Sequence, residues 1–268
     1  MELRRTQARA AKLTVLPATD STNTWLREQA GRVPDSWPHG SVVVTTDQRS
    51  GRGRLERSWQ DLAGKSLAVS LLLRPTSSDG APLSVQHYGW LPLIAGLSVR
   101  EAVADVVAPG VPCTLKWPND LHLSGHKAAG ILAELLSDGL GAIVGIGLNV
   151  LHTADELPLP GTASLVTAGA EVDDDLIDQV LADIVAGVLS RTEALVRADG
   201  DAAIAGLLSE YRSVCSTLGR QVRVERAGQP DRYAEAVDIA ADGQLLLREP
   251  GSDAEFAIAS GDITHLRY

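Results

Sequence analysis

The clearest pattern of hydrophobic and polar positions lies in residues 173–198, where apolar residues recur three or four positions apart. They are Leu176, Ile177, Val180, Leu181, Ile184, Val185, Val188 and Leu189. This spacing places them on one face of an α-helix. Asp173 to Asp175 stand at its start, where the helix dipole favours negative charge. The segment is therefore predicted to be a long amphipathic helix with one buried face.

Short apolar runs rich in β-branched residues are mixed with helical patterns in the first 215 residues. Strands are predicted over 13–16, 41–46, 65–75, 127–136 and 141–150, and helices over 22–31, 91–107 and 201–213. Residues 113–120 are predicted to be a strand that runs into a Pro-Asn-Asp turn, and residues 47–59 a polar, Arg-rich loop. Ser137-Asp138-Gly139 joins the last two strands and predicts that they pair. Because the order is not a regular βαβ alternation, a Rossmann sheet is disfavoured. The pattern indicates an α+β fold with a mixed sheet flanked by helices.

From Gly219 onward the pattern changes to short strands separated by turns. The strands are predicted over 220–226, 232–240, 243–249, 255–260 and 263–268. Turn residues separate them at Ala227-Gly228, Asp242-Gly243 and Gly251-Ser252. The sequence therefore predicts two domains, residues 1–216 and a small β-barrel over 217–268.

Composition places the chain among globular proteins. Hydrophobic residues make up 44% of it, and no apolar run reaches the roughly 18–20 residues that span a bilayer. The basic N-terminus lacks the apolar region of a signal peptide, and its lack of serine disfavours a transit peptide. Cys113 and Cys215 lie far apart and in no metal-ligand spacing, which favours the reducing cytoplasm.

The charge is unevenly spread along the chain. The net charge is −10, which argues against a general nucleic-acid binder. Residues 1–60 nevertheless carry ten Lys or Arg against six Asp or Glu, whereas residues 170–210 carry two against ten. The local positive excess, around Arg49, Arg52, Arg54 and Arg57, suits a small anionic ligand better than a polymer.

The segment GRGRLERSW, residues 51–59, combines three arginines with two glycines. Glycine lets the backbone approach a ligand closely, and guanidinium groups bind phosphate or carboxylate with paired hydrogen bonds. Such a loop can close over an anion and exclude water. The alternative is a solvated, charged surface loop. The segment is not a Gly-x-x-x-x-Gly-Lys phosphate loop, so a P-loop ATPase is not indicated.

Two further segments stand out. KWPND, residues 116–120, ends a predicted strand, and KAAGILAE, residues 127–134, begins one. In the first, Asn119 and Asp120 follow a proline-fixed turn; they either face a ligand or bond their own backbone. In the second, Lys127 precedes small residues and Gly130, which leave room for a ligand beside the strand. The alternative there is a solvated lysine at the start of a strand.

Ser21-Thr22-Asn23 and GIGLNV, residues 145–150, complete the candidate set. The first places three hydrogen-bonding side chains at a helix start, where an N-cap alone is the alternative. In the second, glycines within a strand permit close approach to a flat ligand. The six histidines show no metal-ligand spacing and are assigned no role.

Taken in order, DSTNTWL, TTDQRSGRGRLERSW, KWPNDL, KAAGILAE and GIGLNV resemble the biotin–protein ligase family. GRGRxxRxW, KWPND and KxxGIL are specific in combination, and the resemblance runs over nearly the whole chain. It implies a catalytic domain with a mixed sheet related to class II aminoacyl-tRNA synthetases, followed by an SH3-like barrel. About twelve residues precede the first predicted strand, so the chain is expected to be the monofunctional type without a DNA-binding domain.

The resemblance implies a two-step reaction. Biotin is activated with ATP as biotinyl-5′-AMP, and the biotinyl group then passes to a lysine of a biotin carboxyl carrier protein. ATP and Mg²⁺ are the implied cofactors, with the metal ligands left unassigned. The implied partner is the biotin carboxyl carrier domain of acyl-CoA or pyruvate carboxylases. Neither nucleic acid nor a membrane is expected as a partner, and a weak homodimer is left open.

Residue roles are carried over from the same resemblance. Lys127 and Arg54 are expected to be catalytic, since a cation is needed between two anions. Biotin is expected to meet Ser21, Thr22, Asn23, Gln48, Arg52, Gly53, Arg54, Lys127 and Gly130. ATP or the adenylate is expected to meet Gly51, Arg52, Arg54, Arg57, Trp59, Asn119, Asp120 and Asn149.

Two alternatives stand beside this interpretation. A lipoate–protein ligase shares the fold and the adenylation chemistry, although GRGRxxRxW favours biotin. A biotin-sensing transcriptional repressor is disfavoured by the net charge of −10 and by the short segment before the first strand.

Overall fold

A seven-stranded mixed sheet forms the larger part of the computed structural model, which describes residues 2–54, 57–59, 62–225, 230–259 and 262–265. The strands are β1 (Lys12–Val15), β2 (Ser41–Thr45), β5 (Ser66–Leu73), β6 (Cys113–Lys116), β7 (Asp120–Leu123), β8 (His126–Leu135) and β9 (Ala142–Asn149). Their order across the sheet is β1-β2-β5-β9-β8-β7-β6. Only β1 and β2 pair in parallel, so the predicted mixed sheet is confirmed.

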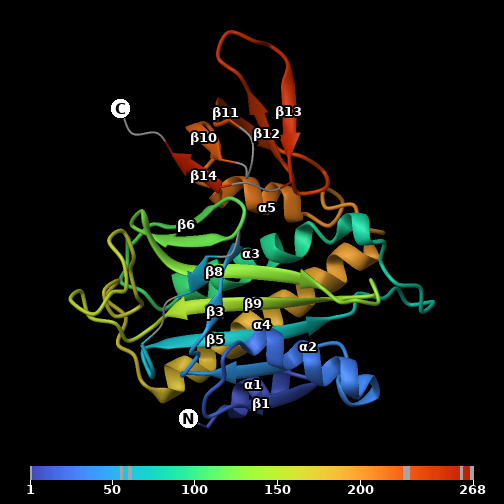
Figure 1. Cartoon of the computed structure of the whole chain (residues 1–268), viewed down its shortest axis with the longest axis vertical. Helices are drawn as coiled ribbons and strands as arrows, with labels where there is room; N and C mark the ends of the chain where they lie inside the picture. Colours follow the sequence, from blue (N-terminus) through green and yellow to red (C-terminus); the bar gives the residue numbers. More distant parts are fainter. Residues whose placement is uncertain (1, 55–56, 60–61, 226–229, 260–261, 266–268) are drawn as a thin grey trace.

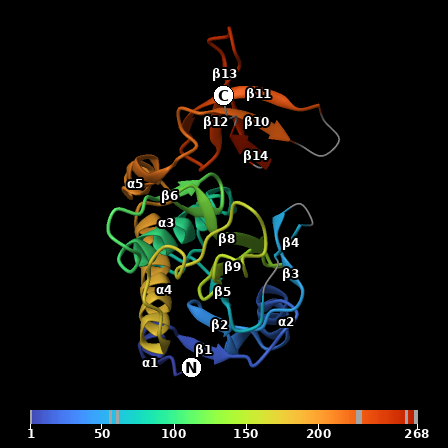
Figure 2. The same cartoon turned by 90° about the vertical axis from the view of Figure 1, so that its left-hand side faces the viewer.

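Helices cover both faces of this sheet (Figures 1 and 2). On one face lie α3 (Trp90–Ala104) and α4 (Asp174–Arg197), together with the short α1 (Arg4–Arg9). On the other lie α2 (Thr22–Arg32) and the hairpin of β3 (Gly51–Arg52) with β4 (Ser58–Trp59). Every residue of β2 and β5 is buried, as expected for central strands covered on both faces.

The amphipathic pattern of residues 173–198 is confirmed by α4. The Asp173 side chain accepts a hydrogen bond from the Leu176 N–H at 2.8 Å and so caps the helix. The predicted apolar face is buried from Ile177 to Val188, against α3 and the sheet. This face supplies much of the core of the larger domain.

Asp178 of α4 also anchors the N-terminal helix α1, which has no side-chain cap of its own. Its carboxylate accepts hydrogen bonds from the Arg5 N–H at 2.8 Å, the Thr6 N–H at 3.0 Å and the Thr6 hydroxyl at 2.8 Å. Burial alone would raise the pKa of Asp178, but the bonds from Thr6 and Arg5 outweigh it and lower the pKa. The ionised carboxylate is therefore the form that holds α1.

We expect Asp178→Ala to lower the free energy of unfolding by about 2–3 kcal/mol, because it removes charge-assisted bonds to buried N–H groups. Since the folded pKa is depressed, the stabilisation in the parent protein is complete above the unfolded aspartate pKa, about 3.9. It is lost as the pH falls through the folded value. Urea unfolding at pH 7 and below pH 4 tests this; a deficit of equal size at both pH values would contradict it.

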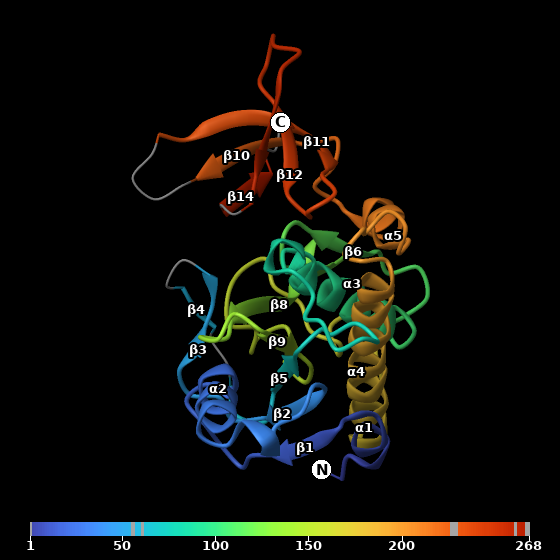
Figure 3. The same ribbon diagram turned by 90° about the vertical axis from the view of Figure 1, so that its right-hand side faces the viewer.

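The C-terminal residues form a separate five-stranded antiparallel sheet, seen above the larger domain in Figures 1 and 3. Its strands are β10 (Gln221–Glu225), β11 (Arg232–Ile239), β12 (Leu245–Arg248), β13 (Glu255–Ile258) and β14 (Asp262–His265), in the order β13-β12-β11-β10-β14. Pairings among the described residues include none between β13 and β14, so closure into an SH3-like barrel stays a prediction. The predicted turn at Ala227-Gly228 and the end of the last strand lie outside the described residues.

Two buried tryptophans, one in α3 and one in the turn between β6 and β7, bond to the turn between β11 and β12. Trp90 donates its indole N–H to the Ala241 carbonyl at 2.7 Å, and Trp117 donates to the Gly243 carbonyl at 3.0 Å. Both side chains are nearly fully buried, at 0% and 2% exposed. The turn between β11 and β12 is therefore fixed against the KWPND segment.

Three local predictions need correction. The helix predicted over 201–213 is only α5 (Leu207–Val214), because Gly206 adopts a left-handed φ of 79° and residues before it form turns. The predicted loop 47–59 contains the hairpin β3–β4, whose described part leaves out Leu55 and Glu56. The strand predicted within 113–120 ends at Lys116 as β6, and Asp120, which was predicted to belong to the turn, begins β7, which turns at Ser124 and Gly125 into β8.

Candidate active site

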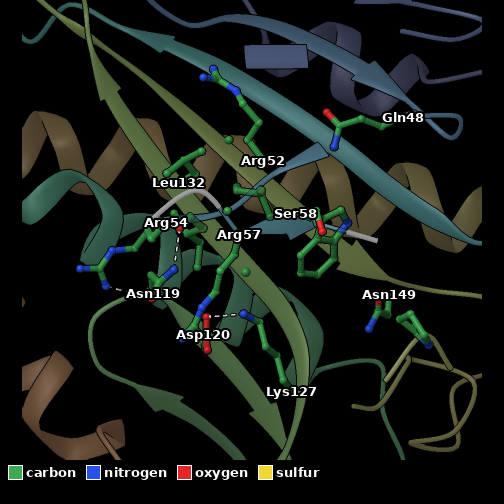
Figure 4. Close-up of a pocket in the computed structure, with 18 of the residues that line it drawn as sticks. Gln48, Arg52, Arg54, Arg57, Ser58, Asn119, Asp120, Lys127, Leu132 and Asn149 are labelled. Atoms are coloured by element: carbon green, nitrogen blue, oxygen red, sulfur yellow. Dashed lines mark hydrogen bonds and ion pairs between the residues drawn. The ribbon is translucent and has the colours of Figure 1, made fainter. Parts of the chain in front are cut away.

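A cavity of about 360 Å³ opens on the face of the sheet that α2 and β3–β4 share (Figure 4). Its wall brings together the start of α2, the arginine loop, the KWPND turn, β8, β9 and the segment 158–162. Of the fifteen residues predicted to bind biotin, ATP or the adenylate, all but Gly51 line it. They are Ser21, Thr22, Asn23, Gln48, Arg52, Gly53, Arg54, Arg57, Trp59, Asn119, Asp120, Lys127, Gly130 and Asn149.

Gly51 lies just behind the wall. A Cβ added there would come within 2.8 Å of the Gln48 side-chain nitrogen and of the Trp59 carbonyl oxygen. Gly51 is therefore required because β3 approaches β4 closely. It is not part of the described lining of the cavity.

Lys127 and Asp120 form an ion pair at the cationic end of the cavity (Figure 4). Their Nζ and Oδ1 atoms are 2.8 Å apart, with side chains 34% and 18% exposed. Asp120 is in β7 and Lys127 in the neighbouring β8, so sheet pairing brings them together. The alternative of a lysine that only meets solvent is wrong for Lys127.

More positive charge gathers around the same carboxylate. Burial lowers the pKa of Arg54; Asp120 opposes this shift and Arg57 adds to it. Lys116 follows the same pattern: burial lowers its pKa, Asp120 raises it, and Lys127 and Arg57 lower it. Arg54, Lys116 and Lys127 therefore share the field of the Asp120 carboxylate, and this cluster of cations favours a bound polyanion.

Asn119 is fixed by the sheet and meets the arginine loop. Its side-chain amide donates to the Ile131 carbonyl of β8 at 2.9 Å, and the Ile131 N–H donates back to the Asn119 carbonyl at 2.8 Å. Its Oδ1 accepts from Arg54 at 3.4 Å (Figure 4). Asn119 thus holds Arg54 at the wall instead of bonding only its own turn.

Arg52 points away from this cationic end (Figure 4). Its guanidinium donates to the two carboxylate oxygens of Glu134 at 2.9 and 3.1 Å and to the Thr24 hydroxyl at 3.1 Å. The two arginines of GRGR therefore occupy different environments, although residues two positions apart in an extended strand share a face. β3 ends at Arg52, so Arg54 lies beyond the strand and is not bound by this alternation. Arg54 is placed near Asp120, and Arg52 is placed near α2.

The opposite end of the cavity is neutral and polar. Ser21 caps α2 by accepting from the Thr24 N–H at 3.4 Å, and Gln48 Oε1 accepts from the Thr22 N–H at 2.9 Å. Asn23 is buried, at 4% exposed, and lies on the same first turn. Ser21 therefore caps α2 and also lines the cavity, together with Thr22 and Asn23.

Trp59 covers the middle of β8 and β9, where the strands carry glycine. A Cβ built on Gly147 would lie 2.5 Å from the indole ring, and one on Gly130 would lie 3.0 Å from it. The indole N–H is buried without a hydrogen-bond partner among the described residues. The Trp59 ring lies against Gly130 and Gly147, and its N–H is available to donate a hydrogen bond. The ring is therefore suited to cover a ligand that supplies an acceptor.

We expect Gly147→Ala to displace Trp59 and to weaken adenylate binding about 10-fold or more, because the new methyl group overlaps the ring. Gly31→Ala, in α2 with no atom within 4 Å of the added Cβ, is the matched control. Adenylate dissociation followed by tryptophan fluorescence measures the effect. Equal adenylate dissociation rates for the two variants would show that Trp59 does not rest on Gly147 when ligand is bound.

Segment 158–162 was not predicted to line the site. The Gly161 carbonyl accepts from the Lys127 N–H at 2.9 Å, and the Ala163 N–H donates to the Lys127 carbonyl at 2.8 Å. Asn149 supports this arrangement by donating to the Ala163 carbonyl at 2.9 Å. Ser58, Ile131, Leu132, Gly145, Ile146 and Gly147 also line the cavity; they lie within the motifs quoted above but were not predicted as individual site residues.

The described residues contain no group of three or more His, Cys, Asp or Glu able to hold a metal. Asp120 is the one acidic residue in the described lining of the cavity. No helix of the described chain is long and apolar enough to span a membrane.

Comparison with known proteins identifies the family of the chain. Residues 15–150 match the model of the biotin/lipoate A/B protein ligase family, and residues 217–266 match that of the biotin protein ligase C-terminal domain. The chain is 33% identical to a biotin–[acetyl-CoA-carboxylase] ligase of Mycobacterium tuberculosis, covering 96% of this chain and 90% of the relative. It is 31% identical to the enzyme of that name from Paracoccus denitrificans, covering 88% and 94%.

Among solved structures, the biotin protein ligase of Aquifex aeolicus in complex with biotin and ATP aligns with a TM-score of 0.69. The alignment has 27% identity and covers 96% of this chain and all of that one. Fold, cavity and relatives together define a ligase. The chain belongs to the biotin/lipoate A/B protein ligase family.

Proposed function

We propose that this chain activates biotin with ATP as biotinyl-5′-AMP and transfers the biotinyl group to a lysine of a biotin carboxyl carrier protein. The observation that carries the proposal is the polarity of the cavity. One end holds the neutral side chains of Ser21, Thr22 and Asn23, and the other holds Arg54, Lys127 and their cationic neighbours. Biotin has the same polarity, since its bicyclic head is neutral and its tail is a carboxylate.

In the first step a biotin carboxylate oxygen attacks the α-phosphorus of ATP, and the bond to pyrophosphate breaks. The obstacle is repulsion between two anions. Lys127 supplies a positive charge between them, and Arg54 adds a guanidinium that can bond the α-phosphate. Arg52, Gly53 and Gly130 contribute to the biotin side, and Arg57, Trp59 and Asn149 to the nucleotide side. Trp59 closes over the product and excludes water.

In the second step the acceptor lysine nitrogen attacks the carbonyl carbon of the mixed anhydride. An N–C bond forms, the C–O bond to phosphate breaks, AMP leaves and a proton goes to solvent. A second cavity of about 380 Å³, between the KWPND turn and the β11–β12 turn, offers the lysine a route. It shares Arg54, Asn119, Ile131 and Leu132 with the first cavity and therefore leads to the reacting end.

Mg²⁺ is proposed to enter on the nucleotide. Mg²⁺ binds through one or two carboxylates plus substrate phosphates and water, so a cavity whose described lining holds the single carboxylate of Asp120 fits it. Asp120 and the side-chain oxygen of Asn119 are the residues that would face it. When bound, the ion neutralises phosphate charge.

Lipoate–protein ligase activity is the competing function, since the family includes both. Thermal unfolding with MgATP and either biotin or lipoate distinguishes them. Biotin is expected to raise the Tm by several degrees through tight binding to the folded state, and lipoate is expected to raise it little. A larger shift with lipoate would overturn the proposal.

The wider setting is also proposed. Carriers of acyl-CoA and pyruvate carboxylases are the expected acceptors. Both cysteines are free, which suits the cytoplasm. The net charge of −10 favours a chain that binds no nucleic acid, and the weak homodimer stays a prediction. A gel-shift assay with biotinyl-AMP present tests for nucleic-acid binding. Sedimentation over a range of protein concentrations tests for the homodimer.

A further inference from the structure

We propose that Glu134 is a positioning residue that fixes the orientation of the Asn23 amide and so makes the site select a ligand with ureido N–H donors. The proposal rests on the proposed function and deepens it. Glu134 does not line the described cavity, but it contacts one residue that does and one arginine of the loop.

The hydrogen bonds of Asn23 leave one position for a ligand. Its Nδ2 donates to Glu134 Oε2 at 2.7 Å and to the Leu132 carbonyl at 3.2 Å, which uses both hydrogens. Its Oδ1 accepts from the Ser70 hydroxyl at 2.6 Å. A carbonyl oxygen has two acceptor positions, so one remains. A Cβ on the cavity-lining Gly145 would collide with this oxygen, so only glycine leaves the space beside it open.

Glu134 removes the alternative orientation of the amide. Turning Asn23 over would place its oxygen against two groups that can only accept, the Glu134 carboxylate and the Leu132 carbonyl. Ser70 does not decide between the orientations, because a hydroxyl can donate or accept. The orientation therefore depends on the carboxylate and on one backbone carbonyl.

Two arginines keep Glu134 ionised. Burial raises the pKa of Glu134, but hydrogen bonds from Asn23 and Arg27 and the charges of Arg27 and Arg52 outweigh this and lower it. Arg27 approaches Oε1 at 2.6 Å, and Arg52 approaches it at 2.9 Å. An ionised carboxylate cannot donate, so it holds the Asn23 oxygen toward the cavity throughout the neutral pH range.

The ligand chemistry follows from this orientation. Asn23 presents an acceptor to the neutral end of the cavity, and a cyclic urea offers two N–H donors there. The dithiolane ring of lipoate offers none. Selection of this kind is strong when the site's polar group is left unpaired by the wrong ligand.

The test uses biotin and its cyclic carbonate isostere, in which ring oxygens replace both ureido N–H groups. Dissociation constants are measured by calorimetry for the parent protein, Glu134→Gln and Arg27→Met. The parent is expected to prefer biotin about 100-fold or more. Glu134→Gln should lose about 10- to 100-fold in affinity for biotin but stay within about 3-fold for the isostere, because the amide can then turn. Arg27→Met removes a partner of Glu134 that does not line the cavity and should retain the preference.

Equal losses for both ligands in Glu134→Gln would mean that the residue only supports the fold, and would overturn the proposal. Unchanged biotin affinity would overturn it as well. If Glu134→Gln fails to fold, the parent protein still decides: equal affinity for biotin and the isostere means that no ureido N–H is selected. A parent protein that binds neither ligand would instead contradict the proposed function.

Discussion

Lys127→Ala is expected to reduce the rate of biotinyl-AMP formation by about 10²- to 10³-fold, the usual effect of removing a preorganised charge from a transition state. Lys127 is placed for this by backbone bonds to segment 161–163 and by its ion pair with Asp120. The fold should persist, because Asp120 keeps Lys116 and Arg54 as cationic neighbours. Pyrophosphate release from biotin and MgATP measures the rate.

Lys65→Ala is the matched control for this prediction. Lys65 has the same side-chain exposure, 34%, and a similar ion pair, 3.0 Å to Glu156, but it does not line the cavity. Its variant should stay within a few-fold of the parent. If Lys127→Ala also stays within a few-fold, the charge between the two anions is supplied by another residue.

Arg54→Ala is expected to release biotinyl-AMP about 10- to 100-fold faster, through the loss of about 1.5–3 kcal/mol of charge-assisted hydrogen bonding. Biotin affinity should change less, because the head of biotin is neutral and Arg54 lies at the cationic end. Released adenylate acylates exposed lysines, so the variant should label an added protein that is not a carrier. Streptavidin blotting of that protein and the adenylate dissociation rate are the two measurements.

Arg49→Ala controls for a general loss of positive charge near the loop. Arg49 is 65% exposed, pairs with Asp47 at 3.2 Å and does not line the cavity. It should leave both measurements unchanged. A greater loss of biotin affinity than of adenylate affinity in Arg54→Ala would place Arg54 in the biotin pocket instead.

Sequence patterns predicted the elements whose side chains have one strong periodicity. The face of α4 and the central strands follow directly from burial, and the turn at 137–139 correctly paired β8 with β9. The helix over 201–213 was overestimated because its apolar residues fit a helix, while the left-handed Gly206 interrupts it. Short elements such as α1 and β3–β4 depend on distant partners, Asp178 in one case and β8 and β9 in the other.

The candidate site was predictable where chemistry and spacing coincide in one motif. The motifs predicted the cationic residues of the site and the polar residues at the start of α2. Fourteen of the fifteen predicted residues line one cavity. Segment 158–162 was missed because its role is to cover Lys127 with backbone groups, which any proline-rich loop could do. The different directions of Arg52 and Arg54 were also missed. Arg52 depends on Glu134, 82 residues further along the chain, and Arg54 depends on Asn119.

The most direct test of the account is transfer of biotin to a carrier. The protein is incubated with biotin, MgATP and a biotin carboxyl carrier domain, and the carrier is examined by intact mass spectrometry. The account predicts one biotinyl group per carrier, on one lysine, dependent on ATP and absent when lipoate replaces biotin. A carrier that remains unmodified with biotin, or that gains a lipoyl group instead, would contradict it.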